Sequence, residues 1–279
     1  MNTSINFSDG FTVLMALYHG DRADFFERAV SSVFSNTLKP NQFIVVVDGP
    51  IPNQLMLSVE KIRNQYPLVE FMHLPTNQGL ANALNHGLRS IRFPWVVRAD
   101  ADDINLPERF FSLAELIKKN PEAKLIGSAI LEVDEHEKPI AIREVPCSEE
   151  EIRIFAKTRN PFNHMAVAYR LDAIQACGGY PTIFLKEDYG LWCHFLAKQF
   201  RAINTNQVLV HATTGVDMFK RRGGWSYAKS EIQMQTLLVN SGLKSYPRAV
   251  LDGLVRAIFF LIPPSLRGYL YIHALRKPY

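Results

Sequence analysis

Three carboxylates stand within four positions of the chain, at Asp100, Asp102 and Asp103. The residues before them, 95–98, form a short run with β-branched residues in the middle, which predicts a buried strand that carries the acidic side chains to the open end of a sheet. Carboxylates this close repel one another, so a folded protein tolerates them mainly with a cation in place. Oxygen ligands favour a hard ion, Mg²⁺ or Mn²⁺. The cluster indicates a metal site, and a solvated acidic turn is the alternative.

A second acidic pair, Glu187 and Asp188, precedes large apolar residues at helical spacing over 191–196. Acidic residues at the start of a helix are also favourable through the helix dipole alone. Ordinary helix capping therefore remains an alternative explanation for this pair.

The segments before the acidic cluster alternate between strands and helices. Apolar runs at 11–18 and 43–47 predict strands buried on both faces, and residues 69–74 predict a third strand. The patterns between them predict helices, the first one capped by Asp21. Such strand–helix–strand units form parallel sheets, and ligands bind outside the carboxyl ends of the strands. Polar or aromatic residues stand at four such ends, namely Tyr18, Asp48, residues 77–79, and Asp100 with Asp102. We expect these residues to line one crevice.

The later part of the chain continues the α/β pattern. A helix is expected after Pro107, a strand over 125–133 with a hairpin partner over 140–145, and a helix with a capping box at residues 148–151. Further strands are expected at 165–169 and 208–211. The fold class predicted for the chain is α/β, with a mostly parallel sheet flanked by helices.

Basic residues are concentrated at the C-terminal end. Residues 220–279 hold ten Lys and Arg against two acidic residues, although the whole chain of 279 residues has a net charge of only +4. Within residues 246–279, the uncharged run that begins at residue 257 is too short to span a bilayer. Basic residues between large apolar ones predict helices that lie on an anionic membrane surface, and a helical pair packed on the body is the alternative. Before them, Arg221, Arg222 and Trp225 flank paired glycines in a loop that suits a phosphate or diphosphate.

Several classes of function are disfavoured. Three cysteines without CxxC spacing argue against a disulfide framework or a zinc site and fit a reducing cytoplasm. The first ten residues are polar and lack a secretory signal pattern. Nucleic-acid binding is disfavoured because the basic residues alternate with large aliphatic ones. A phosphoaspartyl phosphatase would need a DxDG motif after its first strand, which here ends in Tyr18. A non-catalytic sugar- or nucleotide-binding protein remains an alternative to an enzyme.

Five motifs together resemble one enzyme family. They are Val47-Asp48-Gly49, Asn77-x-Gly79-x-x-x-Ala83-x-Asn85, Asp100-x-Asp102-Asp103, Pro107-Glu108-Arg109 and Glu187-Asp188. In this order and spacing the chain is similar to inverting family 2 glycosyltransferases of the GT-A fold over residues 11–225, and to the bacterial branch that builds O-antigen and exopolysaccharide repeat units on a lipid carrier. The QxxRW motif of processive synthases is absent, which implies addition of a single sugar.

The resemblance implies an organisation and a reaction. Residues 1–225 would form the GT-A domain, with a nucleotide-binding half over about 11–105 and an acceptor half over about 106–225, and residues 226–279 would form a basic, amphipathic, membrane-associating helical tail. The enzyme would transfer a hexose (glucose or galactose, with GlcNAc as a third candidate) from a UDP-sugar to a saccharide on an undecaprenyl-type lipid diphosphate. It would form a β-linkage at the inner face of the cell membrane.

The resemblance also implies roles for single residues. The donor nucleotide would be bound by Tyr18, Asp48, Asn77, Gly79, Asn85 and Asp100. Mn²⁺ or Mg²⁺ would be held at the diphosphate by Asp100, Asp102 and, less readily, His211. The acceptor would be contacted by Asp103, Asn163, His164, Arg221, Arg222 and Trp225. The metal would act as a Lewis acid on the leaving nucleoside diphosphate. Asp188 would be the general base, with Glu187 as the second candidate. For His164, a structural role in the core is the alternative.

Overall fold

Nine strands are present in the computed structural model, which describes residues 9–214 and 224–261. They are β1 (Phe11–Tyr18), β2 (Gln42–Asp48), β3 (Val69–His73), β4 (Trp95–Arg98), β5 (Ile104–Asn105), β6 (Ala123–Val133), β7 (Pro139–Arg143), β8 (Ala168–Arg170) and β9 (Arg201–Thr213). The apolar runs at 11–18 and 43–47 thus form strands β1 and β2, as expected where a strand is buried on both faces.

Helices connect most of these strands. They are α1 (Ala23–Phe34), α2 (Asn53–Gln65), α3 (Leu80–Leu88), α4 (Arg109–Lys119), α5 (Glu149–Ala156), α6 (Leu171–Ala176), α7 (Glu187–Ala197), α9 (Trp225–Asn240) and α10 (Tyr246–Leu261), with a 3₁₀ turn η1 (His164–Ala166) before β8. The capping box predicted at the start of α5 is confirmed, because Ser148 Oγ accepts from Glu151 N while the Glu151 side chain accepts from Ser148 N.

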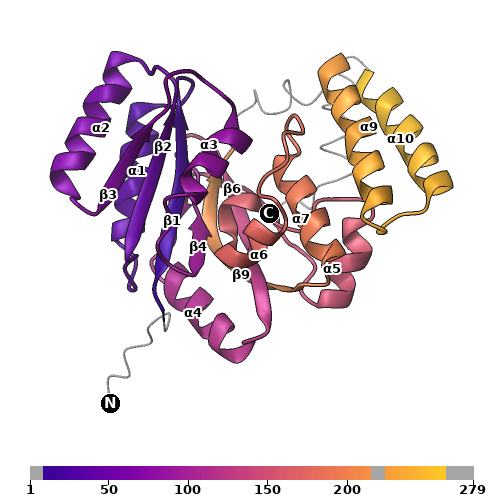
Figure 1. Ribbon diagram of the computed structural model, residues 1–279. Coiled ribbons are helices and arrows are strands. Elements are labelled where there is room, and N and C mark those ends of the chain that lie inside the picture. The colour runs from indigo at the N-terminus through magenta and orange to yellow at the C-terminus, as the bar shows by residue number, and fades with distance from the viewer. Residues whose placement is uncertain (1–8, 215–223, 262–279) are drawn as a thin grey trace.

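All the strands form a single mixed sheet in the order β3-β2-β1-β4-β8-β6-β9-β5, with β7 beside β6 (Figure 1). The first four strands in this order are parallel, and antiparallel pairing begins where β8 joins β4. The predicted α/β class with helices around the sheet is confirmed, and the parallel character belongs mainly to the N-terminal half.

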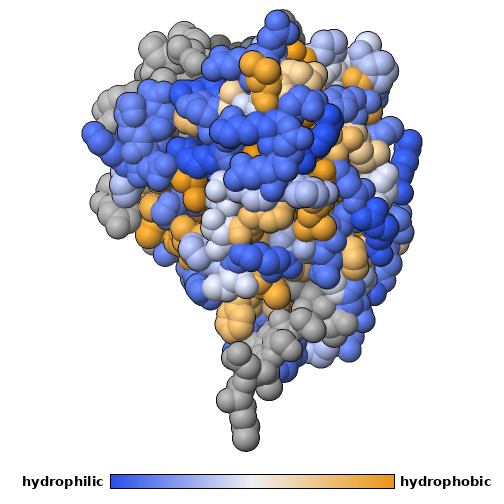
Figure 2. Space-filling view, turned by 90° about the vertical axis from the view of Figure 1, so that its left-hand side faces the viewer, coloured by the Kyte–Doolittle hydropathy of each residue, from blue (hydrophilic) through white to orange (hydrophobic). Residues whose placement is uncertain are grey.

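The sheet separates two hydrophobic cores. In β1, Phe11, Val13, Met15 and Leu17 pack with α1, α2 and α4 on one face, whereas Leu14 packs with α3, α5 and α7 on the other. Alternate side chains of a strand point to opposite faces, so one apolar strand contributes to both cores. The outer face of α2, seen in Figure 2, carries mainly hydrophilic side chains with smaller hydrophobic areas between them.

The C-terminal helices pack on the body through α7. Tyr189 and Cys193 of α7 form a small buried cluster with Met234 and Leu238 of α9, and α10 lies alongside α9 at the side of the molecule opposite α2 (Figure 1). The helical character expected for 226–279 is present as far as Leu261, and residues 262–279 lie outside the described part. None of the helices in residues 9–214 and 224–261 combines the length and apolar character that crossing a bilayer requires.

Two local predictions were wrong. Residues 165–169 do not form one strand, because Ala166 N donates to Asn163 O and closes the η1 turn before β8 begins. Asp21 does not cap α1, whose N-cap is Arg22; the Asp21 carboxylate instead accepts the N–H of Tyr18 at 2.8 Å. A short polar side chain can bond to the preceding turn as well as to the helix that follows.

Candidate active site

The predicted strand ends meet at one edge of the sheet. β1 lies between β2 and β4, all three are parallel, and the register pairs Tyr18 with Asp48 at the ends of their strands. β4 ends at Arg98, opposite Leu14 and four residues before the end of β1, and the next residue, Ala99, donates its N–H to Leu14 O at 3.1 Å. The parallel topology therefore brings the predicted nucleotide-binding positions together.

Asp48 ties the 77–79 loop to the end of β2. Its Oδ1 accepts from Gln78 N at 2.7 Å and its Oδ2 from Gly79 N at 2.9 Å, while the Asn77 side chain donates to the Asp48 carbonyl. Gly79 has a φ of 84°, in the left-handed region that favours glycine. Asp48, Asn77 and Gly79 thus form one hydrogen-bonded unit at the predicted donor side.

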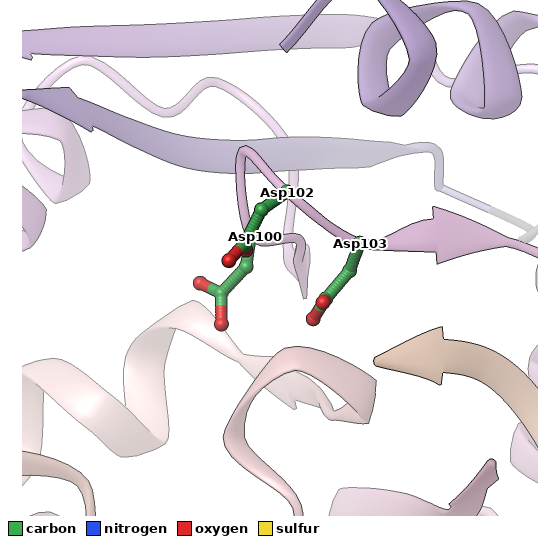
Figure 3. Close-up of side chains that lie close together, drawn as sticks. All are labelled: Asp100, Asp102 and Asp103. Carbon is green, nitrogen blue, oxygen red and sulfur yellow. The ribbon is translucent and has the colours of Figure 1, made fainter. Parts of the chain in front are cut away.

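Asp100, Asp102 and Asp103 converge as predicted. Each offers a carboxylate oxygen, and these atoms all lie within 4.8 Å of one another. Figure 3 shows the three side chains pointing to the same side of the loop that joins β4 to β5. Asp103 is buried, its Oδ1 accepts from Thr213 N at 2.8 Å, and its Oδ2 has no hydrogen-bond partner.

This acidic cluster has the properties of a cation site. Burial, together with the charges of Asp102 and Asp100, raises the pKa of Asp103 well above its usual value. A divalent cation would neutralise these charges and would give the orphaned Asp103 oxygen a partner, and an all-oxygen ligand set suits Mg²⁺ or Mn²⁺. The residues present therefore fit the metal that the sequence predicts.

Asp21 is a fourth acidic residue at this edge, which the sequence reasoning assigned only to capping. The pKa of Asp21 is raised to about 7, mainly by burial and also by the charges of Asp102 and Asp100. The hydrogen bond from the Tyr18 N–H lowers this pKa in part. A cavity of about 460 Å³ opens beside Asp21, between the loop after β1 and the first residues of α2. The only signal in the sequence was its position directly after a strand end.

Two buried arginines lie behind the acidic cluster. Arg98 donates to Leu14 O at 3.3 Å and also bonds Ala99 O and Asp100 Oδ1. Arg109 donates to the carbonyls of Arg98 and Met165, both at 2.8 Å, and burial lowers its pKa to about 9. The Pro107-Glu108-Arg109 motif thus delivers a cation that holds the backbone on which the cluster is built.

Glu187 and Asp188 are the first two residues of α7. Asp188 Oδ2 accepts from Asn160 Nδ2 at 2.6 Å and Oδ1 from Tyr189 N at 2.7 Å. The pKa of Glu187 is raised to about 7, first by burial and then by the charge of Asp188. The charge of Arg98 lowers this pKa and the charge of Asp100 raises it. The acidic pair is therefore within electrostatic reach of the acidic cluster, although almost ninety residues separate them.

Four predicted contact residues have other partners in the structure. Asn85 uses its side chain on the backbone of Tyr180, accepting from N and donating to O at 2.8 Å each. Asn163 is buried and donates to Ser128 O at 2.9 Å. His164 lies 3.0 Å from the Tyr180 hydroxyl, and burial lowers its pKa well below the usual value, which supports the structural alternative. His211 is not part of the acidic cluster. Burial lowers its pKa, and the nearby charge that raises this pKa is that of Glu137.

The basic loop can be followed only in part. Arg221 and Arg222 lie outside the described residues, whereas Trp225 is the first residue of α9 and 79% exposed. An exposed indole is available for contacts with a partner, so its predicted acceptor role stays a prediction.

The comparison with known proteins decides the family. Residues 12–178 match the family model described as Glycosyl transferase family 2. The chain belongs to this family. It is 35% identical over 94% of its length to an amylovoran biosynthesis glycosyltransferase, AmsE, of Erwinia amylovora, covering 97% of that protein. It is 36% identical over 96% of its length to a UDP-Gal:alpha-D-GlcNAc-diphosphoundecaprenol beta-1,3-galactosyltransferase of Escherichia coli, again covering 97%.

Solved structures agree on the fold. TarS 1-349 of S. aureus in complex with UDP-GlcNAc superposes with a TM-score of 0.67 at 17% identity, over 96% of this chain and 76% of that one. The mannosyltransferase PcManGT of Pyrobaculum calidifontis, in complex with GDP-Man and Mn²⁺, gives 0.65 at 17% identity with the same coverage. The predicted GT-A glycosyltransferase fold is thereby confirmed.

Proposed function

We propose that this family 2 glycosyltransferase is an inverting enzyme that transfers a hexose from a UDP-sugar to a saccharide linked to a lipid diphosphate, in the synthesis of a surface polysaccharide. The observation that carries the proposal is the acidic cluster at the strand ends, facing a second carboxylate pair at the start of α7. The E. coli relative, which acts on a diphosphoundecaprenol-linked sugar, supports the acceptor class.

The donor would bind at the edge of the parallel half. Tyr18, Asp48 and the 77–79 loop would hold the nucleoside, with the cavity beside Asp21 at the same edge. Asp100 and Asp102, with the unpartnered oxygen of Asp103, would hold Mn²⁺ or Mg²⁺. When bound, this ion supplies Lewis-acid stabilisation of the leaving diphosphate.

Asp188 would remove the proton from the acceptor hydroxyl as that oxygen attacks the anomeric carbon. The Asn160 amide donates to one of its oxygens and the Tyr189 N–H to the other, and these two contacts orient the carboxylate. One in-line displacement inverts the configuration, so an α-linked donor gives a β-linked product. Glu187 remains the second candidate, because a pKa of about 7 also suits a general base near neutral pH.

The lipid-linked acceptor would be approached from the cytoplasmic face of the cell membrane. On α10, Val250, Leu251, Leu254 and Val255 are between 44 and 60% exposed, which leaves an apolar face on this helix. Such a face, with basic residues nearby, would bind an anionic membrane peripherally. Arg221, Arg222 and Trp225 would contact the acceptor's diphosphate and sugar.

Turnover with defined substrates tests the proposal. Incubation with Mn²⁺, a GlcNAc-diphosphate-lipid acceptor and each of UDP-galactose, UDP-glucose and UDP-GlcNAc should release UDP with one donor, and linkage analysis should give a β-linked product. Consumption of no donor with this or related lipid-linked acceptors would contradict the proposal, and donor binding without turnover would instead support a nucleotide-sugar-binding protein.

Membrane binding has a separate test. Leu254→Glu should reduce co-sedimentation with vesicles that contain anionic lipid, because it places a charge on the exposed face of α10. Leu57→Glu is the matched control, since Leu57 is 71% exposed on α2 at the opposite side of the molecule. Equal binding by both variants would exclude this face as the contact surface.

A further inference from the structure

An ionic cluster around a buried ion pair joins α7, which carries the proposed base, to the C-terminal helices. It consists of Lys186 before α7, Glu231 on α9 and Arg256 on α10. The Lys186 and Glu231 side chains are only 8% and 1% exposed and form a direct ion pair. Arg256 Nη1 approaches Glu231 Oε1 at 3.5 Å, and the same oxygen accepts from Gln235 at 2.7 Å. The cluster thus connects three segments that are distant in the sequence.

The first connection to the active site runs through Lys186. This residue is the N-cap of α7 and stands directly before Glu187 and Asp188. Its ammonium group pairs with Glu231 and lies 4.8 Å from the centre of the Tyr227 ring of α9. Because the backbone of residue 186 leads directly into the acidic pair, holding the Lys186 side chain restricts where the first turn of α7 can lie.

The second connection runs through Arg256. Besides Glu231, its guanidinium group bonds the carbonyl of Thr158, in the segment that follows α5. Two residues further on, Asn160 donates to Asp188 Oδ2 at 2.6 Å. Arg256 therefore holds the backbone of the segment that orients the proposed base, while Glu231 holds the residue before that base.

Stability alone does not account for this arrangement. Taking two charges out of water costs several kcal/mol, and apolar side chains of similar size often serve a protein interior as well or better. The ion pair stands next to the proposed base, where misplacement by about 1 Å costs about 100-fold in rate. Directional contacts are more useful there than an apolar contact, which fixes orientation less strictly.

We propose that Glu231 and Arg256 are positioning residues that set the Glu187–Asp188 carboxylates against the acceptor. The inference rests on the proposed function, because it assigns the base to this pair. It makes the C-terminal helices part of the catalytic apparatus as well as a candidate membrane contact.

Arg256→Ala, assayed with a short-chain, water-soluble acceptor analogue, separates positioning from membrane binding. We expect kcat to fall about 10- to 100-fold while the KM for the UDP-sugar stays within about twofold. Arg256→Lys should recover only part of kcat, because an ammonium group cannot reproduce the two-sided contact of a guanidinium. Arg248→Ala is the matched control: it removes the same charge from α10, at a side chain that is 62% exposed and paired with Asp252. A kcat equal in Arg256→Ala and Arg248→Ala would overturn the proposal.

The double variant Lys186→Met/Glu231→Leu covers the case in which single variants fail to fold. It removes both charges together, so neither is left buried alone, and its thermal unfolding should resemble that of the wild type. We expect its kcat to be at least about tenfold lower at unchanged donor affinity. Wild-type kcat in this variant would overturn the proposal. If instead the wild type turns over with no lipid-linked or soluble acceptor, it is the proposed function that fails.

Discussion

The acidic cluster and the acidic pair of α7 are supported in different ways. Asp100, Asp102 and Asp103 lie within four positions on the loop that follows β4, although Arg109 and Thr213 add contacts from farther along the chain. Asp188 accepts from Asn160, and we propose that Glu231 and Arg256 position the acidic pair indirectly, through Lys186 and the Thr158 carbonyl. The first arrangement is local in sequence, and the second depends on the tertiary structure.

This difference separates the chemistry of the two sites. Repulsion among the three carboxylates of the acidic cluster favours a bound cation, so we expect substitutions there to alter donor and metal binding. The acidic pair is held by neutral amides and distant charges, so small displacements should affect proton transfer without affecting the donor. Variants of each site should therefore differ in which kinetic parameter they change.

Asp102→Ala should have the largest effect. Loss of a metal ligand removes several kcal/mol of stabilisation from the transition state, and we expect kcat/KM to fall about 10⁴-fold. Calorimetric titration with UDP should lose its dependence on Mn²⁺. Asp172→Ala is the control, because its side chain is 54% exposed and pairs with Arg170. Metal-dependent UDP binding by Asp102→Ala would show that the cluster does not hold the ion.

Asp188→Ala should stop turnover but spare donor binding. Removal of a general base costs about 10²–10⁴-fold in rate, and UDP-sugar affinity should stay within about threefold of the wild type. Single-turnover assays together with calorimetry measure both quantities. If Glu187→Gln instead shows the larger loss of kcat, the second candidate is the base.

Asn160→Ala should have an intermediate effect. It removes the amide that donates to Asp188 Oδ2, so we expect kcat about tenfold lower at unchanged donor affinity. Asn120→Ala is the matched control, because its amide bonds only the preceding turn of α4 at Leu116 O in the described structure. An equal kcat for the two variants would mean that Asn160 does not orient the base.

The smallest expected effect is on the pH dependence of thermal stability. The pKa of Glu187 rises from 4.5 to about 7 because of burial and the charge of Asp188. The folded state therefore holds this proton more strongly than the unfolded state, and the contribution to stability is complete below pH 4.5 and lost as the pH rises through 7. Between pH 5 and 8 the wild type should lose about 2–4 °C more in Tm than Glu187→Gln. Parallel Tm curves for the two proteins would contradict the pKa shift.

Much of the N-terminal half could be predicted from the sequence. Runs such as 11–18 and 43–47 are apolar throughout, which is typical of parallel strands covered on both faces, and the resulting topology places Tyr18, Asp48 and Asp100 at one edge. The mixed half was harder, because β5 and β8 are only two and three residues long and owe their pairing to their neighbours in the sheet. A strand of that length has no periodicity to read.

The candidate site also has a part that could be predicted from the sequence and a part that could not. The acidic cluster was recognisable because repulsion between neighbouring carboxylates can be read from spacing alone. Asn85 stands in a family motif and His164 was a candidate acceptor contact. The side chains of both hold Tyr180 in the interior, and only the packing around them reveals this. Lys186, Asn160 and Glu231 gave no signal, because a buried ion pair and a single amide contact between distant segments have no sequence pattern.

The ionic contact between α7 and the C-terminal helices also limits how enzymes of this kind can be recombined. A hybrid that joins the donor half of one family member to the acceptor half of another should keep α7, α9 and α10 from the same parent. If α7 and α9 came from different parents, Lys186 could face a residue other than Glu231. Its ammonium charge would then be buried without a partner, where water cannot solvate it. A crossover between β4 and β6, by contrast, leaves all three members of the ionic cluster on one parent, so this contact would be preserved.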